Sequence, residues 1–122
     1  MIQLRTILTS ADNSGAKKMR VIGLPGFSKR HTAGIGDVIK ASVLRATPMG
    51  QVKKGDKVNV LIVRTRKEIR RKDGSYVRFG DNAGVLINKA GVLLGSRIFG
   101  PVPYEIKQAG HEQVVSLAKE VV

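Results

Sequence analysis

Short apolar segments separated by turn-forming residues make up most of this chain, which is the pattern of a small β protein. The spacing predicts strands over residues 2–9, 19–24, 38–46, 57–63 and 83–88. The segment 57–63 is apolar on both faces, as in a strand that is covered on both sides. In the segment 38–46 the alternation leaves the buried face ambiguous. Turn signals at residues 11–15 and at Pro48 with Gly50 end the first and third strands.

The pattern becomes helical near the end of the chain. Residues 103–109 begin with a proline and are followed by Gly110, as in a short helix. A second helix is predicted because apolar residues follow at i, i+3, i+4 and i+7: Val114, Leu117, Ala118 and Val121. Five strands followed by two helices predict a mainly β fold, a small closed five-stranded β-barrel with two short C-terminal helices.

A projecting β-ribbon is predicted over about residues 64–80, because Asp73 followed by Gly74 is a strong hairpin signal. If these two residues form the whole loop, Arg71 lies opposite Tyr76 in the ribbon. In that register both faces carry charged side chains, and neither is apolar enough to pack on a core. A two-stranded ribbon of this kind is marginal in water, so we expect a polyanion to order it.

Charge is strongly unbalanced in this sequence. The chain has 122 residues, a length typical of one domain, and 22 Lys and Arg against nine Asp and Glu give a net charge of +13. Residues 103–122 hold two lysines and three glutamates, a net charge of −1, which leaves +14 for residues 1–102. We therefore expect one domain with a basic barrel over residues 1–102 that binds an anion such as nucleic acid, and a helical cap over residues 103–122 with another role.

The basic residues fall at predicted turns and in the ribbon, where barrel loops can converge on one ligand. Scattered solvated charge would explain any one basic pair but explains all of them poorly. Aromatic residues interleaved with arginine favour nucleic acid. The residues predicted to contact RNA are Lys17, Lys18, Lys29, Arg30, Lys53, Lys54, Arg64, Arg66, Lys67, Arg70, Arg71, Lys72, Tyr76 and Arg78, with Phe79 as a further candidate.

The sequence offers few groups for catalysis or metal binding. It has no cysteine, and its two histidines, His31 and His111, have no second ligand at metal spacing. The aspartates stand beside glycine or asparagine, where carboxylates usually bond to local backbone amides. We expect no catalytic residue, no metal and no cofactor. An enzyme acting on nucleic acid would need clustered carboxylates, and a membrane-surface protein would need a basic amphipathic helix, whereas the predicted helices are slightly acidic.

Several motifs resemble those of a known family. They are ADNSGA at residues 11–16, GDVI at 36–39, VKKGD at 52–56, VRTRKEIRRKDGSYVRFGDNAGVLI at 63–87 and SRIFGPV at 96–102. Together they resemble the family of the universal large-subunit ribosomal protein numbered fourteen in bacteria, over essentially the whole chain. The sequence departs from the family pattern at Asn59, at Gly80, in residues 92–94 and 111–113, and at Lys119.

The resemblance implies a structural constituent of the large ribosomal subunit that binds large-subunit rRNA near the subunit interface. It implies a contribution to an intersubunit bridge, through small-subunit rRNA, and contacts with neighbouring large-subunit ribosomal proteins. Ser96, Arg97 and Phe99, with the tail, are the residues expected at the bridge or at a partner such as a ribosome-silencing factor. The expected location is the ribosome, in the cytoplasm or an organellar matrix, with no membrane and no small-molecule substrate. The alternative is another small basic β-barrel RNA-binding protein that acts in translation or ribosome assembly.

Overall fold

Five strands form a closed barrel in the computed structural model, which describes residues 2–24 and 31–122. The barrel strands are β1 (Ile7–Ser10), β2 (Ala16–Gly23), β3 (Val38–Ala46), β4 (Lys57–Arg64) and β7 (Ala83–Ile87). Neighbours along the order β1-β2-β3-β4-β7 are antiparallel, and β1 closes the barrel by pairing parallel to β7. Closure removes the exposed sheet edges that would otherwise pair with other chains. The predicted five-stranded barrel is confirmed.

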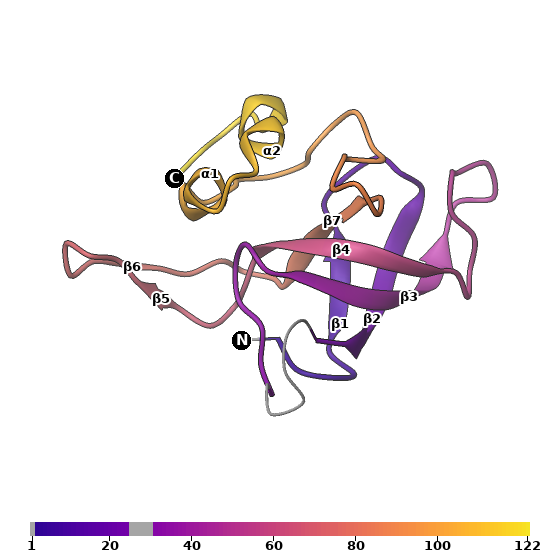
Figure 1. Ribbon diagram of the computed structural model, residues 1–122, viewed down its shortest axis with the longest axis horizontal. Helices are drawn as coiled ribbons and strands as arrows, with labels where there is room; N and C mark the ends of the chain where they lie inside the picture. Colours follow the sequence, from indigo (N-terminus) through magenta and orange to yellow (C-terminus); the bar gives the residue numbers. More distant parts are fainter. Residues whose placement is uncertain (1, 25–30) are drawn as a thin grey trace.

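A two-stranded ribbon, β5 (Ile69–Arg70) with β6 (Tyr76–Val77), leaves the barrel between β4 and β7. Figure 1 shows it extending away from the barrel along the long axis of the molecule, with the C-terminal helices on the same side. The helices are α1 (Glu105–Gln108) and α2 (Glu112–Leu117). The predicted projecting ribbon and the two short C-terminal helices are therefore confirmed.

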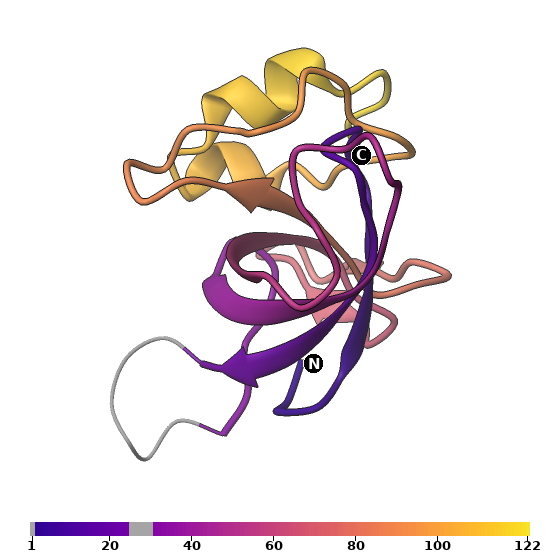
Figure 2. The same ribbon diagram turned by 90° about the vertical axis from the view of Figure 1, so that its right-hand side faces the viewer.

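Strand β4 is apolar on both faces because it separates two hydrophobic clusters. Val60 and Ile62 point into the barrel interior, with Leu8 and Met19 among their neighbours in that cluster. Leu61 and Val63 belong to a second cluster, outside the barrel, that includes Val102, Ile106 and Val114 of the C-terminal segment. In Figure 2 the two helices lie on one side of the barrel, directly over β7. The tail thus covers apolar positions on the outer face of β4 and β7.

Four of the five strands have bounds that differ from the sequence prediction. Strand β2 runs over Ala16–Gly23 and not over residues 19–24, and β4 and β7 each differ by one residue at the end. The first strand begins at Ile7 and not at residue 2, because Arg5 adopts a positive φ of 69° that interrupts extended backbone. Ile2 instead forms an isolated bridge with Ala33. The ambiguity of β3 is resolved by burial, since Ile39, Ala41 and Val43 are buried.

The predicted apolar stripe of the second helix is only partly formed. Val114 is buried, but Leu117 is 36 % exposed. The helix ends at Leu117, and Val121 lies beyond it in a parallel bridge with Val102. The end of the chain therefore packs as extended backbone, which a helical pattern could not reveal.

Candidate nucleic-acid interface

The ribbon turns through a three-residue loop, and the two-residue loop predicted from Asp73 and Gly74 is wrong. The Arg71 N–H donates to the Ser75 carbonyl at 2.8 Å, and the Gly74 N–H donates to the Arg71 carbonyl at 3.0 Å. Gly74 has a φ of 88°, whereas Asp73 does not take a positive φ. Lys72, Asp73 and Gly74 are therefore the loop, as in a type I turn followed by a left-handed glycine.

The Asp73 carboxylate selects this loop by binding the backbone that follows it. Its Oδ1 accepts the Ser75 N–H at 2.9 Å and the Ser75 hydroxyl at 2.6 Å. These hydrogen bonds, with that from the hydroxyl first in importance, lower the pKa of Asp73 from its ordinary value of 3.8. An aspartate that bonds its own backbone two residues on is a turn in itself, so Asp73 has no need of the left-handed conformation.

The longer loop shifts the pairing register by one residue. The side chains of one strand therefore lie on the opposite face, relative to those of the other strand, from the one predicted. Ile69 lies opposite Val77, and Arg70 lies opposite Tyr76. A shift of one residue moves every side chain of one strand to the other face relative to its partner. The predicted pairing of Arg71 with Tyr76 is wrong for this reason.

One face of the ribbon is half-buried and the other is exposed. The half-buried side chains are Ile69, Arg71, Val77 and Phe79, whereas Glu68, Arg70, Lys72, Tyr76 and Arg78 are exposed. The expectation that neither face could pack is therefore wrong. Because the apolar side chains share one face, the cations that remain on the other form a surface that we call the cationic face.

The cationic face carries an aromatic ring among its charges. Tyr76 is 63 % exposed and is the direct partner of Arg70. Among the described residues of this face, Glu68 carries the carboxylate. A hydrogen bond of 3.0 Å from Lys67 is the main cause that lowers the pKa of Glu68. Since that pair is exposed, it is weak. Arginines around an exposed tyrosine can neutralise phosphates while the ring packs on a sugar or base.

Arg71, predicted to contact RNA, is bound by the tail. Its Nε lies 2.7 Å from Glu105 Oε1, and its Nη2 donates to the Val122 carbonyl at 2.7 Å. Its side chain is 27 % exposed and that of Glu105 is 26 % exposed. A guanidinium with these partners holds the ribbon against the tail, so we remove Arg71 from the RNA-contact set.

Arg64 is also a structural residue, and it is buried. Its Nε and Nη2 donate to the two oxygens of Asp81 at 3.0 and 3.4 Å, and its Nη1 donates to the Phe99 carbonyl at 2.7 Å. Gly100, at a φ of 81°, lets the backbone pass so close that an added Cβ would collide with the guanidinium. Arg64 joins the end of β4 to the returning ribbon and to the segment before the tail, and it leaves the RNA-contact set as well.

Four of the other predicted cations form a second group at the opposite end of the barrel. Lys17 and Lys18 are exposed on β2, and Lys53 and Lys54 are exposed in the loop between β3 and β4. Figure 1 shows that loop at the end of the molecule away from the ribbon, so the basic loops do not converge on one rim. Arg66 and Lys67 are exposed near the base of the ribbon, and Lys29 and Arg30 lie outside the described residues.

Sequence reasoning missed several exposed cations, three of them on strands and one, Lys89, in the turn after β7. Arg20, Lys40, Lys57 and Lys89 are exposed, the first three of them on the barrel wall. The alternation of side chains along a strand could have indicated them. Lys18 and Arg20 stand two positions apart on β2, and such residues point to the same face of a regular strand. A bulge between Lys18 and Met19 breaks that alternation locally.

The predicted bridge residues are exposed and held in place by the first turn. Asn13 Oδ1 accepts the N–H groups of Ser96 and Arg97 at 2.8 and 3.1 Å, and Asn13 Nδ2 donates to the Ser96 hydroxyl at 3.0 Å. Phe99 is 53 % exposed. An exposed aromatic side chain beside an arginine on a fixed loop is typical of a protein-contact surface.

The described residues contain no group of three histidine, cysteine or acidic side chains that could hold a metal ion. Asp37, Asp56 and Asp73 bond to local backbone amides, as expected, whereas Asp12 also reaches a distant strand. Asp12 accepts the hydroxyls of Ser10 and Ser14 and the N–H of Leu86. Within residues 2–24 and 31–122, no helix has the length and apolar character that spanning a membrane requires.

A closed β-barrel with a cationic ribbon and a near-neutral helical cap defines the class of small basic β-barrel proteins to which this chain belongs. The sequence model of the family described as ribosomal protein L14p/L23e matches residues 1–122. The chain belongs to this family, which confirms the resemblance. Its members are structural proteins of the large ribosomal subunit and not enzymes.

Proposed function

We propose that the protein binds large-subunit rRNA through the cationic face of the ribbon. The observation that carries this proposal is the separation of the ribbon into a half-buried face and a face with Arg70, Lys72, Arg78 and an exposed Tyr76. Concentrated cations of this kind are stabilised by phosphates, which position a protein on RNA without reading its sequence.

The second cationic group supports a contact at another point of the same RNA. Lys17 and Lys18 lie near Lys53 and Lys54, because the turn before β2 bonds to the β3–β4 loop through Gly15 with Thr47 and through Ser14 with Gln51. Two groups at opposite ends of the barrel suit a large folded RNA better than a short fragment. Arg66 and Lys67 extend the ribbon contact toward the barrel.

The exposed Ser96, Arg97 and Phe99 are proposed as the surface for the subunit interface and for protein partners. Their support is the fixed loop geometry, with an exposed aromatic ring next to a cation, and the net charge of −1 on residues 103–122 beside it. A near-neutral tail does not repel a protein partner, and Arg97 supplies a cation that can contact an rRNA phosphate. Small-subunit rRNA, a neighbouring large-subunit protein and a ribosome-silencing factor are the expected occupants.

Sedimentation of the tagged protein with ribosomal subunits tests the assignment to the large subunit. Binding to a large-subunit rRNA fragment, measured between 50 and 200 mM salt, tests the mechanism. If about six to ten phosphates are neutralised, affinity falls by about 10³ to 10⁵ over that range. Affinity that stays constant with salt, or a protein that sediments apart from the large subunit, would overturn the proposal.

A further inference from the structure

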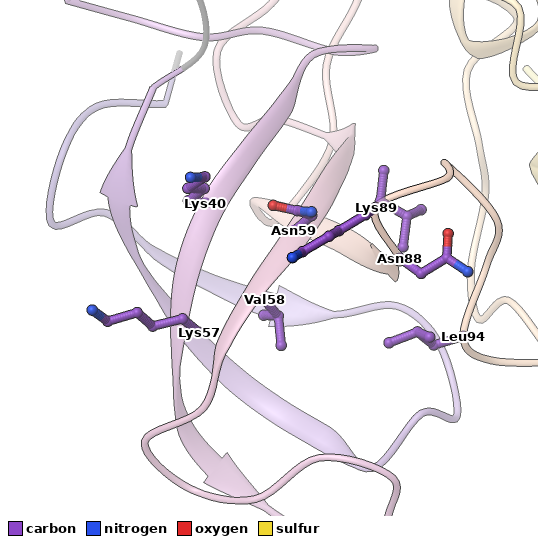
Figure 3. A pocket seen from close by; sticks show the side chains of 8 residues that line it. Lys40, Lys57, Val58, Asn59, Asn88, Lys89 and Leu94 are labelled. Carbon is purple, nitrogen blue, oxygen red and sulfur yellow. The ribbon is translucent and has the colours of Figure 1, made fainter.

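A pocket of about 650 Å³ lies at the end of the barrel where β4 begins and β7 ends, beyond the edge of the tail, and its lining joins the outer face of β4 to the margin of the interior cluster. Its volume is within the range of small-ligand sites in proteins, roughly 300 to 1,000 Å³. Figure 3 shows the side chains around it. It is lined by Lys40, Lys57, Val58, Asn59, Ile87, Asn88, Lys89 and Leu94. None of the lysines was among the predicted RNA contacts, and the pocket is separate from the ribbon.

Strand register places the centre of the pocket. Asn59 on β4 lies between Lys40 on β3 and Ile87 on β7, its two partners in the sheet. Further along the outer face of β4, Leu61 and Val63 are buried in the cluster that includes the tail, whereas Asn59 is only half-buried. The pocket therefore begins where the cover of the tail ends.

The remaining wall is a loop fixed to β7. The Asn88 carboxamide oxygen accepts the N–H groups of Ala90 and Val92, both at 2.9 Å, and the Leu94 N–H donates to the Leu86 carbonyl at 3.1 Å. Leu94 packs against the barrel-interior cluster together with Val58. These bonds fix the backbone that carries Lys89 and Leu94 against the end of β7.

The chemistry of the lining combines positive charge with an apolar surface. In the described part of the chain, Lys40, Lys57 and Lys89 form no ion pair, and the Asn59 carboxamide has no hydrogen-bond partner. In Figure 3 the Lys89 side chain extends toward Asn59, and Val58 and Leu94 lie below them. Three uncompensated ammonium groups raise the local potential, and an anion relieves their mutual repulsion.

We propose that this pocket receives one unstacked nucleotide of a single-stranded RNA segment. The lysines bind the flanking phosphates, the base packs against Val58 and Leu94, and the Asn59 carboxamide pairs with the base edge. A simple anion would leave the apolar surface unused, and an acidic peptide offers no flat ring with donors and acceptors for a carboxamide. This proposal rests on the proposed RNA-binding function and adds a single-stranded contact to it.

Amide and side-chain NMR signals of the protein test the pocket directly. The probes are a short oligoadenylate, the same ribose–phosphate chain without bases, free AMP and an oligoglutamate peptide. We expect the signals of Asn59, Lys89 and Leu94 to shift with oligoadenylate, which should bind about tenfold more tightly than the abasic chain because the abasic chain buries no base against the apolar lining. AMP and oligoglutamate should bind more weakly than oligoadenylate.

Two variants and one control complete the experiment. Leu94→Ala should remove most of the preference for oligoadenylate over the abasic chain. Lys89→Gln, on an exposed residue, should weaken the binding of both chains and lower the slope of log affinity against log salt concentration by about 0.7. Lys119→Gln makes the same change of charge on the tail and should alter neither. If Leu94→Ala impairs folding, Asn59→Asp at the centre of the pocket replaces it, and the added negative charge should weaken oligoadenylate binding.

The outcomes separate this proposal from the proposed function. Pocket signals that stay unchanged while those of Arg70 and Tyr76 shift with rRNA would overturn the pocket alone. Equal affinity for the abasic chain, for AMP or for oligoglutamate would also overturn it. Loss of all RNA binding together with sedimentation apart from the large subunit would overturn the proposed function itself.

Discussion

Arg71 in the ribbon and Glu105 at the start of α1 form an ion pair in which Nε lies 2.7 Å from Oε1. Arg71 also donates to the Val122 carbonyl, so one guanidinium contacts both ends of the tail. Because Arg71 lies on the half-buried face of the ribbon, this contact turns the opposite face outward. The tail thereby helps to orient the surface that we propose for RNA.

Glu105→Gln should loosen the ribbon without unfolding the barrel. The substitution keeps the shape of the side chain but removes the charge, and a partly exposed pair of this kind contributes about 1 kcal/mol. Urea unfolding should show that loss, and hydrogen exchange at the Arg71 amide, which bonds to Ser75, should become faster. Glu112→Gln, in the first turn of α2, is the matched control. Unchanged exchange in Glu105→Gln would mean that the pair does not restrain the ribbon.

Arg64→Lys should destabilise the protein although it conserves the charge. An ammonium group cannot reach both Asp81 oxygens and the Phe99 carbonyl together, so a buried acceptor loses its donor at a cost of about 2 kcal/mol. Thermal or urea unfolding measures the change. Arg66→Lys, on an exposed neighbour, should stay within about 0.5 kcal/mol of the parent. Equal stability of the two variants would contradict a structural role for Arg64.

The double variant Arg70→Gln and Arg78→Gln should weaken binding to a large-subunit rRNA fragment. Two lost phosphate contacts lower the salt slope by about 1.4 to 1.8, with no loss of barrel stability because both side chains are exposed. Lys107→Gln with Lys119→Gln changes the net charge equally on the tail and serves as the control. A similar loss in both double variants would show that net charge and not the cationic face determines affinity.

The ribbon turn should become less ordered in acid. The pKa of Asp73 in the folded protein is lowered below 3.8 by its hydrogen bonds from Ser75, so its contribution is complete above that pH and is lost as pH falls through the lowered value. The Ser75 amide chemical shift should follow this titration. In Asp73→Asn the shift should be insensitive to pH in the same range. A Ser75 signal that does not change in the parent would mean that the bond is absent in solution.

The strands could be predicted because their patterns are local. The third predicted strand has the bounds found for β3, and the fourth and fifth differ from β4 and β7 by one residue at the end. The first strand was predicted too long because nothing in the sequence marks the positive φ of Arg5. The short aspartate loops were also predictable, since a carboxylate reaches the backbone within a few residues.

The roles of individual arginines could not be predicted in this way. Arg64 and Arg71 stand in the same basic run as Arg70, and composition treats them alike. Their partners are Asp81, Phe99 and Glu105, which are 17 to 35 residues away in the chain. The pocket around Asn59 was missed for the same reason, because its walls come from three strands and a loop.

The sequence by itself determined that the chain forms a small β-barrel with a basic body and a near-neutral helical tail. The hydrophobic period and the turn chemistry depend on neighbouring residues, and the net charge is a sum over the chain. Tertiary structure decided which cations remain available to a ligand. That choice depends on the register of the ribbon, where a loop longer by one residue exchanges the faces, and on the packing of the tail, which binds Arg71 and leaves Arg70 exposed.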